Sequence, residues 1–255
     1  MLNVGRLWRV MATGFCFVMF GVGGLGIAGA AVPLLILIPG RHRRQYLTRE
    51  LVHHSFRLHV ALMRLTGAIG CVIHGREKLA RGGLLILANH PSLIDVVMLM
   101  SLVHRPDCIV KAALWRNPFT WGPVSLTGFI SNASGPELVE AGLASVRSGN
   151  NLIIFPEGTR TVPSHRSTFQ RGAANIACRG DLAITPVIIT CTETFLTKGQ
   201  PWYKVPPRKP IFELTVLDDL PPSSQITGSD EPARHSRRLT EYLENYFYGE
   251  VEQHG

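Results

Sequence analysis

Residues 83–95 read GLLILANHPSLID and join an apolar run to a polar loop. The run at 83–89 has the length and the leucine and isoleucine content of a buried strand. Pro91 favours the first position of a helix, which predicts that a helix begins there and that His90 caps it. The positive end of the helix dipole would favour a neutral imidazole, as a general base requires. Asp95 then lies one turn inside this helix and can accept a hydrogen bond from His90.

The His90–Asp95 pair matches the base and its orienting carboxylate in a serine hydrolase, but no nucleophile accompanies it. The chain has no G-x-S-x-G sequence, which disfavours a thioesterase or lipase that attacks through its own serine. We therefore expect the activated hydroxyl to belong to the substrate. A capping histidine beside an unrelated aspartate is the alternative for this motif taken alone.

Further apolar runs of strand length follow the first one, and segments with helical patterns lie between them. The strands are expected at 108–112, 151–155, 183–190 and 211–217, and the helices at 91–104, 135–148 and 168–179. A last helix is expected after Ser229-Asp230-Glu231-Pro232, which reads as a helix start. This alternation predicts an α/β fold with a mixed or largely parallel sheet flanked by helices.

Composition limits the classes of protein that remain. The chain has 255 residues, of which 45% are hydrophobic and 17% charged, which excludes a disordered protein. Its formal charge of +8 favours anionic partners, such as lipid headgroups, phosphorylated substrates or nucleic acid. No nucleic-acid-binding module is recognisable, so we expect no nucleic acid partner. Five cysteines without a C-x-x-C pair argue against a disulfide framework and a structural metal, and favour a reducing compartment.

The N-terminal segment carries no charged side chain from Met11 to Gly40. This run exceeds the roughly 18 to 20 apolar residues that mark a membrane segment. Its middle reads GVGGLGIAGAAVP (21–33), and the glycines and Pro33 disfavour one continuous rod. We expect residues 1–45 to form a membrane anchor, a re-entrant hairpin with both ends in the cytoplasm. A single tilted span and a cleaved signal peptide are the alternatives.

Residues 46–70 are expected to form a basic amphipathic helix at the membrane interface. Basic residues and histidines alternate there with apolar residues at roughly helical spacing. We expect His53, His54 and His59 to face solvent or lipid headgroups rather than a metal ion.

A second polar motif, FPEGTR, occupies 155–160 at the end of a predicted strand, and Glu157 follows His90 by 67 residues. Gly158 permits a tight turn, and the planar guanidinium of Arg160 suits a phosphate group. Taken alone, this motif is also compatible with an ordinary turn at the end of a strand.

Together, H-x-x-x-x-D at 90–95 and FPEGTR at 155–160 resemble the hallmark motifs of the glycerolipid acyltransferase family. The similarity continues through CIVKAALWRNPFTWGPVSLTG (108–128), FQRGAANIA (169–177) and ITPVII (184–189). It covers about residues 72–190 and implies an acyltransferase domain over 71–255, with the mixed α/β fold of that family.

The resemblance implies transfer of a fatty acyl chain from acyl-CoA or acyl carrier protein to the hydroxyl of a lysophospholipid, by default lysophosphatidate. His90 would deprotonate this hydroxyl, Asp95 would hold His90, and neither an acyl-enzyme nor a metal or cofactor would be needed. The enzyme would lie in the membrane, in bacteria the inner membrane, with its catalytic domain on the cytoplasmic face. The expected substrate-binding residues are Glu157, which would order its loop, Gly158, Thr159 and Arg160, and, as further phosphate contacts, Lys111 and Arg171.

One stretch departs from the family pattern. The family's second block usually ends in an arginine that helps to bind glycerol phosphate, whereas Gly128-Phe129-Ile130-Ser131-Asn132 ends in an uncharged asparagine. This departure keeps a specialised acceptor open, such as an aminolipid or a glycolipid. An inactive, membrane-binding relative is the remaining alternative.

Overall fold

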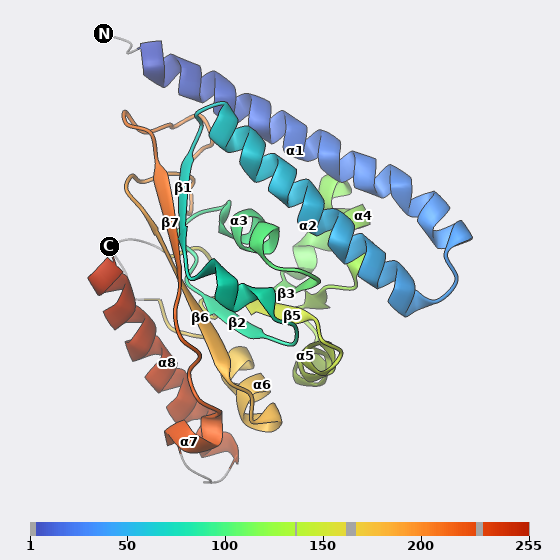
Figure 1. Cartoon of the computed structure of the whole chain (residues 1–255), viewed down its shortest axis with the longest axis vertical. Coiled ribbons are helices and arrows are strands. Elements are labelled where there is room, and N and C mark those ends of the chain that lie inside the picture. The colour runs from blue at the N-terminus through green and yellow to red at the C-terminus, as the bar shows by residue number, and fades with distance from the viewer. Residues whose placement is uncertain (1–3, 136, 162–166, 228–231, 255) are drawn as a thin grey trace.

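A seven-stranded mixed sheet lies at the centre of the computed structural model, which describes residues 4–135, 137–161, 167–227 and 232–254 (Figure 1). The strand order is β1-β7-β6-β2-β5-β3-β4, and all neighbours are parallel except β6 and β7. The predicted α/β fold with a mixed sheet is confirmed. The strands are β1 (Gly70–His74), β2 (Leu85–Ala88), β3 (Pro106–Val110), β4 (Ile130–Ser131), β5 (Asn151–Ile154), β6 (Ile184–Cys191) and β7 (Ile211–Val216).

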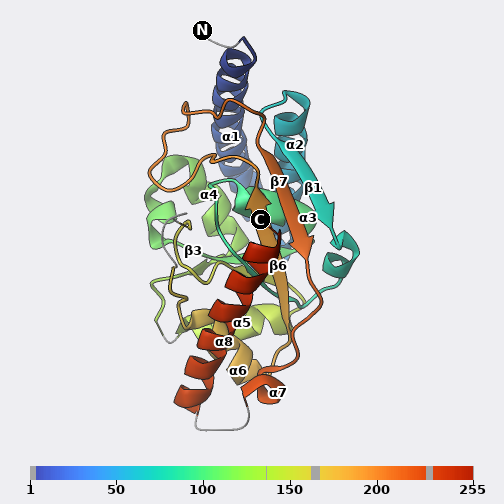
Figure 2. The same ribbon diagram turned by 90° about the vertical axis from the view of Figure 1, so that its left-hand side faces the viewer.

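Helices cover both faces of this sheet (Figures 1 and 2). One face carries α1 (Val4–Leu37), α2 (Arg41–Leu65), α3 (Asp95–Leu102) and α4 (Pro118–Thr127). The other carries α5 (Glu137–Arg147), α6 (Gly172–Gly180) and α8 (Pro232–His254), with the short α7 (Ser223–Thr227) beside α8. Two 3₁₀ turns, η1 (Arg76–Ala80) and η2 (Ala112–Arg116), follow β1 and β3. Ser229–Glu231, the predicted helix start, lie outside the described residues.

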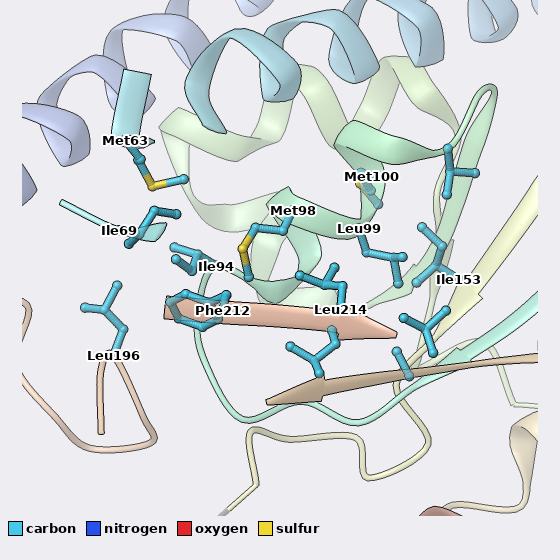
Figure 3. Packing of buried hydrophobic residues seen from close by; sticks show 14 of the residues in the cluster. Met63, Ile69, Ile94, Met98, Leu99, Met100, Ile153, Leu196, Phe212 and Leu214 are labelled. Carbon is cyan, nitrogen blue, oxygen red and sulfur yellow. The ribbon is translucent and has the colours of Figure 1, made fainter. Parts of the chain in front are cut away.

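Two hydrophobic clusters result from the alternation of side chains along the strands. In β2, Ile86 and Ala88 belong to the cluster beneath α2 and α3, whereas Leu85 and Leu87 belong to the cluster beneath α5, α6 and α8. Figure 3 shows the first cluster, in which side chains of α2 and α3 meet those of β7. Both faces of the central strand are thus buried, as its uninterrupted apolar sequence requires.

The expected re-entrant turn inside residues 21–33 is not formed, because α1 runs as one helix from Val4 to Leu37. Its glycines instead allow α4 to approach closely. A Cβ atom at Gly24 of α1 would collide with the backbone carbonyl oxygen of Phe119 in α4, and one at Gly122 of α4 would lie 2.5 Å from the Cβ of Ala28 in α1. The chain turns only at Gly40, whose φ of 90° suits glycine, before α2 runs back along α1.

Helix α2 is bound firmly to the rest of the domain. Arg49 is buried and pairs with the buried Asp107 of β3, with Nη2 2.8 Å from Oδ2. The ring Nδ1 of His53 lies 2.9 Å from the carbonyl oxygen of Met100 in α3. The expectation that His53 faces solvent is therefore wrong, because its partner on α3 buries it, whereas His54 is exposed. It is also wrong for His59, which is half-buried and packs against Phe20 of α1. The helix was expected to extend to residue 70, but α2 ends at Leu65, and residue 70 is the first residue of β1.

Candidate active site

The two predicted motifs meet at the carboxyl edge of the sheet. His90 follows β2 and Glu157 follows β5, and these strands are parallel neighbours. Oε1 of Glu157 accepts a hydrogen bond from the backbone N–H of His90 at 3.0 Å. The backbone N–H of Thr161 donates to the carbonyl oxygen of His90 at 2.7 Å. Polar groups at one edge of a parallel sheet are a common arrangement for a ligand site.

The imidazole of His90 is held by Asp95. Its Nδ1 lies 3.0 Å from Oδ2 of Asp95, whose side chain is fully buried. The same oxygen accepts a hydrogen bond from the backbone N–H of Ser92 at 2.6 Å. The ring of Phe155 packs against that of His90 with 4.5 Å between centroids. With Nδ1 engaged, Nε2 is the ring nitrogen that can take a proton from a bound hydroxyl.

The local backbone differs from the expected helix start. Helix α3 begins at Asp95, and residues 91–94 form a turn closed by the Ser92 to Asp95 hydrogen bond. His90 is therefore not the helix cap, as Pro91 led us to expect. The effect of a helix dipole falls off within the first turn, so the dipole argument made from the sequence does not apply to His90. What the structure shows is that Asp95 fixes the orientation of the ring.

The electrostatics of Asp95 combine two opposing effects. Burial raises the pKa of its carboxyl above the ordinary value, and the hydrogen bonds from His90 and Ser92 oppose this rise. Oδ1 of Asp95 and Oε2 of Glu157 are both buried and have no hydrogen-bond partner among the described residues. Two buried acidic side chains thus hold His90: Asp95 contacts its ring, and Glu157 contacts its backbone.

The remaining residues of FPEGTR have different environments. Glu157 is buried, and its Oε1 also accepts a hydrogen bond from the hydroxyl of Thr161 at 2.8 Å. Gly158 is exposed and has a φ of 64°, which favours glycine, and Thr159 beside it is partly buried. Nη1 of Arg160 donates to the carbonyl oxygens of Leu196 and Thr197 at 2.9 and 3.0 Å. The guanidinium of Arg160 is thus anchored by one nitrogen to the segment after β6.

Lys111 and Arg171 are exposed, and neither side chain has a hydrogen bond or ion pair within the described part of the chain. Lys111 follows β3 and therefore lies at the same edge of the sheet as His90, whereas Arg171 directly precedes α6. Oδ1 of Asn132 accepts a hydrogen bond from the backbone N–H of Ala112 at 3.1 Å. Asn132 thus fixes the loop after β3, and it supplies no charge.

An apolar cavity of about 130 Å³ opens beside the His90 motif. It lies between α1, α2, the start of α3 and the segment after β6. Figure 3 shows Met63, Ile69, Ile94 and Leu196, which line it together with Phe17 of α1. The sequence did not predict this cavity, because its walls come from segments far apart in the chain.

Three further residues hold the site together and were missed. Ser92 donates its hydroxyl to the carbonyl oxygen of Phe195 at 2.9 Å. Thr161 links the two motifs, as described above. Leu196 is a buried residue with a φ of 55°, and its carbonyl oxygen accepts from Leu93 and Arg160. Ser92 and Thr161 could have been found by their positions within and directly after the motifs, whereas nothing in the sequence marks Leu196.

Comparisons with known proteins bear on this arrangement. The sequence model of the family described as Acyltransferase matches residues 70–190. The 1-acyl-sn-glycerol-3-phosphate acyltransferase of Helicobacter pylori is 32% identical over 174 residues, which cover 65% of this chain and 70% of that protein. The chain belongs to the acyltransferase family. Within this family, the 1-acyl-sn-glycerol-3-phosphate acyltransferase of Saccharomyces cerevisiae is 28% identical over 191 residues, 71% of this chain.

A solved acyltransferase shares the fold. The crystal structure of the 1-acyl-sn-glycerophosphate (LPA) acyltransferase PlsC from Thermotoga maritima matches with a TM-score of 0.70 at 21% identity, covering 99% of this chain and 97% of that one. The chain spans 60% of the length of the yeast relative and 55% of a chloroplastic relative from Brassica napus.

Proposed function

We propose that this protein is a membrane-associated O-acyltransferase that moves a fatty acyl chain from a thioester to the hydroxyl of a lysophospholipid, by default lysophosphatidate. The observation that carries the proposal is the 3.0 Å contact between Nδ1 of His90 and Oδ2 of the buried Asp95. This contact leaves one imidazole nitrogen as a base. The hydroxyl within the motif, that of Ser92, is buried and donates to the carbonyl oxygen of Phe195, so it is not available as a nucleophile. A hydroxyl of the substrate then fills this role.

In the proposed mechanism, Nε2 of His90 takes the proton of the acceptor hydroxyl as its oxygen attacks the thioester carbonyl carbon. The tetrahedral intermediate then collapses, the carbon–sulfur bond breaks, and the leaving thiolate receives the proton from the imidazolium. Asp95 holds the ring and stabilises its positive charge during this transfer. The products are an ester and a free thiol, and the acyl donor, acyl-CoA or acyl carrier protein, is the only co-substrate needed.

We assign the acceptor's phosphate to the tip of the FPEGTR loop. Gly158 is exposed there, Arg160 keeps N–H groups beyond the one that binds carbonyl oxygens, and Thr159 lies between them. Lys111, unpaired in the described structure and at the same sheet edge, can approach a phosphate from the β3 side. Arg171 is the most peripheral candidate. Lysophosphatidate is the default acceptor because the relatives reported above carry the name of 1-acyl-sn-glycerol-3-phosphate acyltransferases.

The proposed membrane contact rests on α1. Residues Val4–Ala30 are long and apolar enough to cross a membrane. A stripe of half-exposed apolar side chains repeats at intervals of three and four residues: Trp8, Met11, Phe15, Val18, Val22 and Leu25. The opposite side of α1 lines the apolar cavity beside His90. A lipid surface would cover the stripe and could deliver acyl chains to that cavity, with the site on the cytoplasmic face.

A second acceptor class is favoured by Asn132. Its side chain is uncharged and already hydrogen-bonded to Ala112. A cation at this position would add a charge-assisted contact of about 1.5 to 3 kcal/mol to a phosphate. Without that contact, the same chemistry fits a specialised acceptor lipid such as an aminolipid or a glycolipid.

The test is an acceptor panel analysed by lipid mass spectrometry. Purified protein in detergent receives acyl-CoA or acyl carrier protein donors with lysophosphatidate and several lyso-lipids that lack the terminal phosphate. The proposal expects phosphatidate as the main product. Acylation of another acceptor alone would transfer the assignment to the second class, and no acylation of any acceptor would contradict the function.

A further inference from the structure

A second, polar cavity of about 530 Å³ lies in the segment that joins β6 to β7, residues 192–210, which we name the β6–β7 loop. Lys198 and Lys204 line it from the loop, and Arg6 lines it from α1. Both lysines are exposed. The volume of the cavity falls within the range of roughly 300 to 1,000 Å³ that is usual for sites of small organic ligands.

The β6–β7 loop is strongly basic. It contains Lys198, Lys204, Arg208 and Lys209 against a single acidic residue, Glu193. None of these four basic side chains forms an ion pair within the described ranges of the chain. Arg6 and Arg9 of α1 add two guanidinium groups, which donate to the carbonyl oxygens of Val205, Pro206 and Pro207. Among the residues that line the cavity, three are basic, Arg6, Lys198 and Lys204, and one is acidic, Glu193. The cavity therefore presents a net positive charge to an anion.

The same loop is fastened to the catalytic motifs. The carbonyl oxygens of Leu196 and Thr197 accept hydrogen bonds from Arg160, and that of Phe195 accepts one from Ser92. Phe195 and Leu196 also line the apolar cavity, whereas Thr194 and Thr197 line the polar one. One short stretch of backbone, residues 194–197, thus forms a wall of both cavities beside the reacting histidine.

We propose that the polar cavity binds the phosphate-bearing nucleotide of a coenzyme A thioester, whose acyl chain reaches the apolar cavity across this shared wall. The inference rests on the proposed function, because it assigns the donor of that reaction. A coenzyme A thioester combines an apolar chain with a polyanionic head, which matches the apolar and cationic cavities on either side of residues 194–197. A concave site with two exposed lysines fits a nucleotide better than it fits a flat lipid surface.

The test compares the wild type with the double variant Lys198→Gln/Lys204→Gln, in the full chain in detergent. Arg147→Gln on α5 is the matched control, because it removes a basic side chain remote from both cavities. We expect the Kd of free coenzyme A, measured by calorimetry, and the KM for acyl-CoA to rise about tenfold or more in the double variant only. The kcat and the KM for the acceptor should stay unchanged.

Several results would overturn the assignment. These are no measurable coenzyme A binding by the wild type, or equal Kd and KM values in wild type and double variant. The double variant could instead bind only phosphatidylglycerol vesicles more weakly, or show a higher KM only for acyl carrier protein or for the acceptor. Either result would mean that the two lysines bind that partner and not coenzyme A. Coenzyme A binding can be measured without turnover. If the wild type binds coenzyme A but transfers no acyl chain, the proposed function is contradicted while the coenzyme A site is retained.

Discussion

Oε1 of Glu157 lies 3.0 Å from the backbone nitrogen of His90, so a carboxylate of one motif accepts a hydrogen bond from the backbone of the other. This contact joins two loops that are separated by 67 residues in the sequence. It sets the position of the histidine's backbone, while Asp95 sets the orientation of its ring. The proposed base is therefore fixed at both ends by buried carboxylates.

Thr161 should act as a positioning residue through these contacts. Its hydroxyl donates to Glu157 at 2.8 Å, and its backbone N–H donates to His90. We expect Thr161→Val to lower kcat about tenfold with little change in the KM of either substrate. The lost hydrogen bond holds the loop that positions His90, whereas no contact with a substrate is removed. Thr161→Ser keeps the hydroxyl and should restore kcat. Equal kcat values for all three proteins would remove Thr161 from this role.

Asp95→Asn should separate activity from stability. Burial raises the pKa of Asp95 in the folded protein, so the folded state holds the proton more tightly than the unfolded state. The contribution of Asp95 to the free energy of unfolding is then fully present below the pKa that Asp95 has in the unfolded chain. It is lost as pH rises through the higher pKa that Asp95 has in the folded protein. We expect Asp95→Asn to remove this dependence, to keep or raise Tm at pH 7, and to lower kcat roughly 10²- to 10⁴-fold.

Thermal unfolding at several pH values, together with steady-state rates, checks this prediction. In the wild type, kcat should also fall as pH falls through the raised pKa, because a protonated Asp95 is neutral and no longer stabilises the positive charge that forms on the imidazole. An Asp95→Asn protein with a normal kcat would contradict the orienting role.

Cys191 should be dispensable for turnover. Burial raises the pKa of its thiol to about 11, so only about one thiol in ten thousand is ionised at pH 7. We expect Cys191→Ala to keep kcat within a factor of about two, and intact-protein mass spectrometry of the wild type with donor alone to show no acyl adduct. A covalent acyl-protein that then reacts with the acceptor would replace direct attack by a two-step mechanism.

Arg49 should be essential to the fold, because it forms a buried ion pair with Asp107 across α2 and β3. We expect Arg49→Met to lower the free energy of unfolding by about 3–5 kcal/mol, since it leaves a buried carboxylate uncompensated. Arg179→Met, which breaks an exposed pair with Glu140, should cost about 0–1 kcal/mol. Urea unfolding measures both, and similar losses would mean that α2 is not an integral part of the domain.

The sequence predicted what depends on local pattern. The apolar runs at 151–155 and 183–190 closely match β5 and β6, because buried strands need uninterrupted apolar residues. His90 and Asp95 were predicted to interact because Asp95 was expected one turn inside a helix beginning at Pro91. The contact is present, although the helix begins only at Asp95. The contact between Glu157 and the backbone of His90 was not predicted, because it depends on β2 and β5 being neighbours in the sheet.

Features that depend on distant partners were not predicted. The glycines of α1 indicated a turn, yet they serve the approach of α4, which the local sequence does not show. The burial of His53 depends on Met100, 47 residues away. The start of α3 at Asp95 was missed because Pro91 is a helix-start signal that the Ser92 to Asp95 hydrogen bond overrides. Leu196 has its role through backbone geometry alone.

The central claim is that His90 activates a substrate hydroxyl, and the most direct measurement is acyl transfer by purified wild type and His90→Ala, quantified by lipid mass spectrometry. Circular dichroism and membrane flotation show whether the variant is folded and bound as the wild type is. The account predicts a folded variant with no acyl transfer above the uncatalysed background. A folded His90→Ala protein that acylates the same acceptor at a rate comparable to the wild type would contradict it.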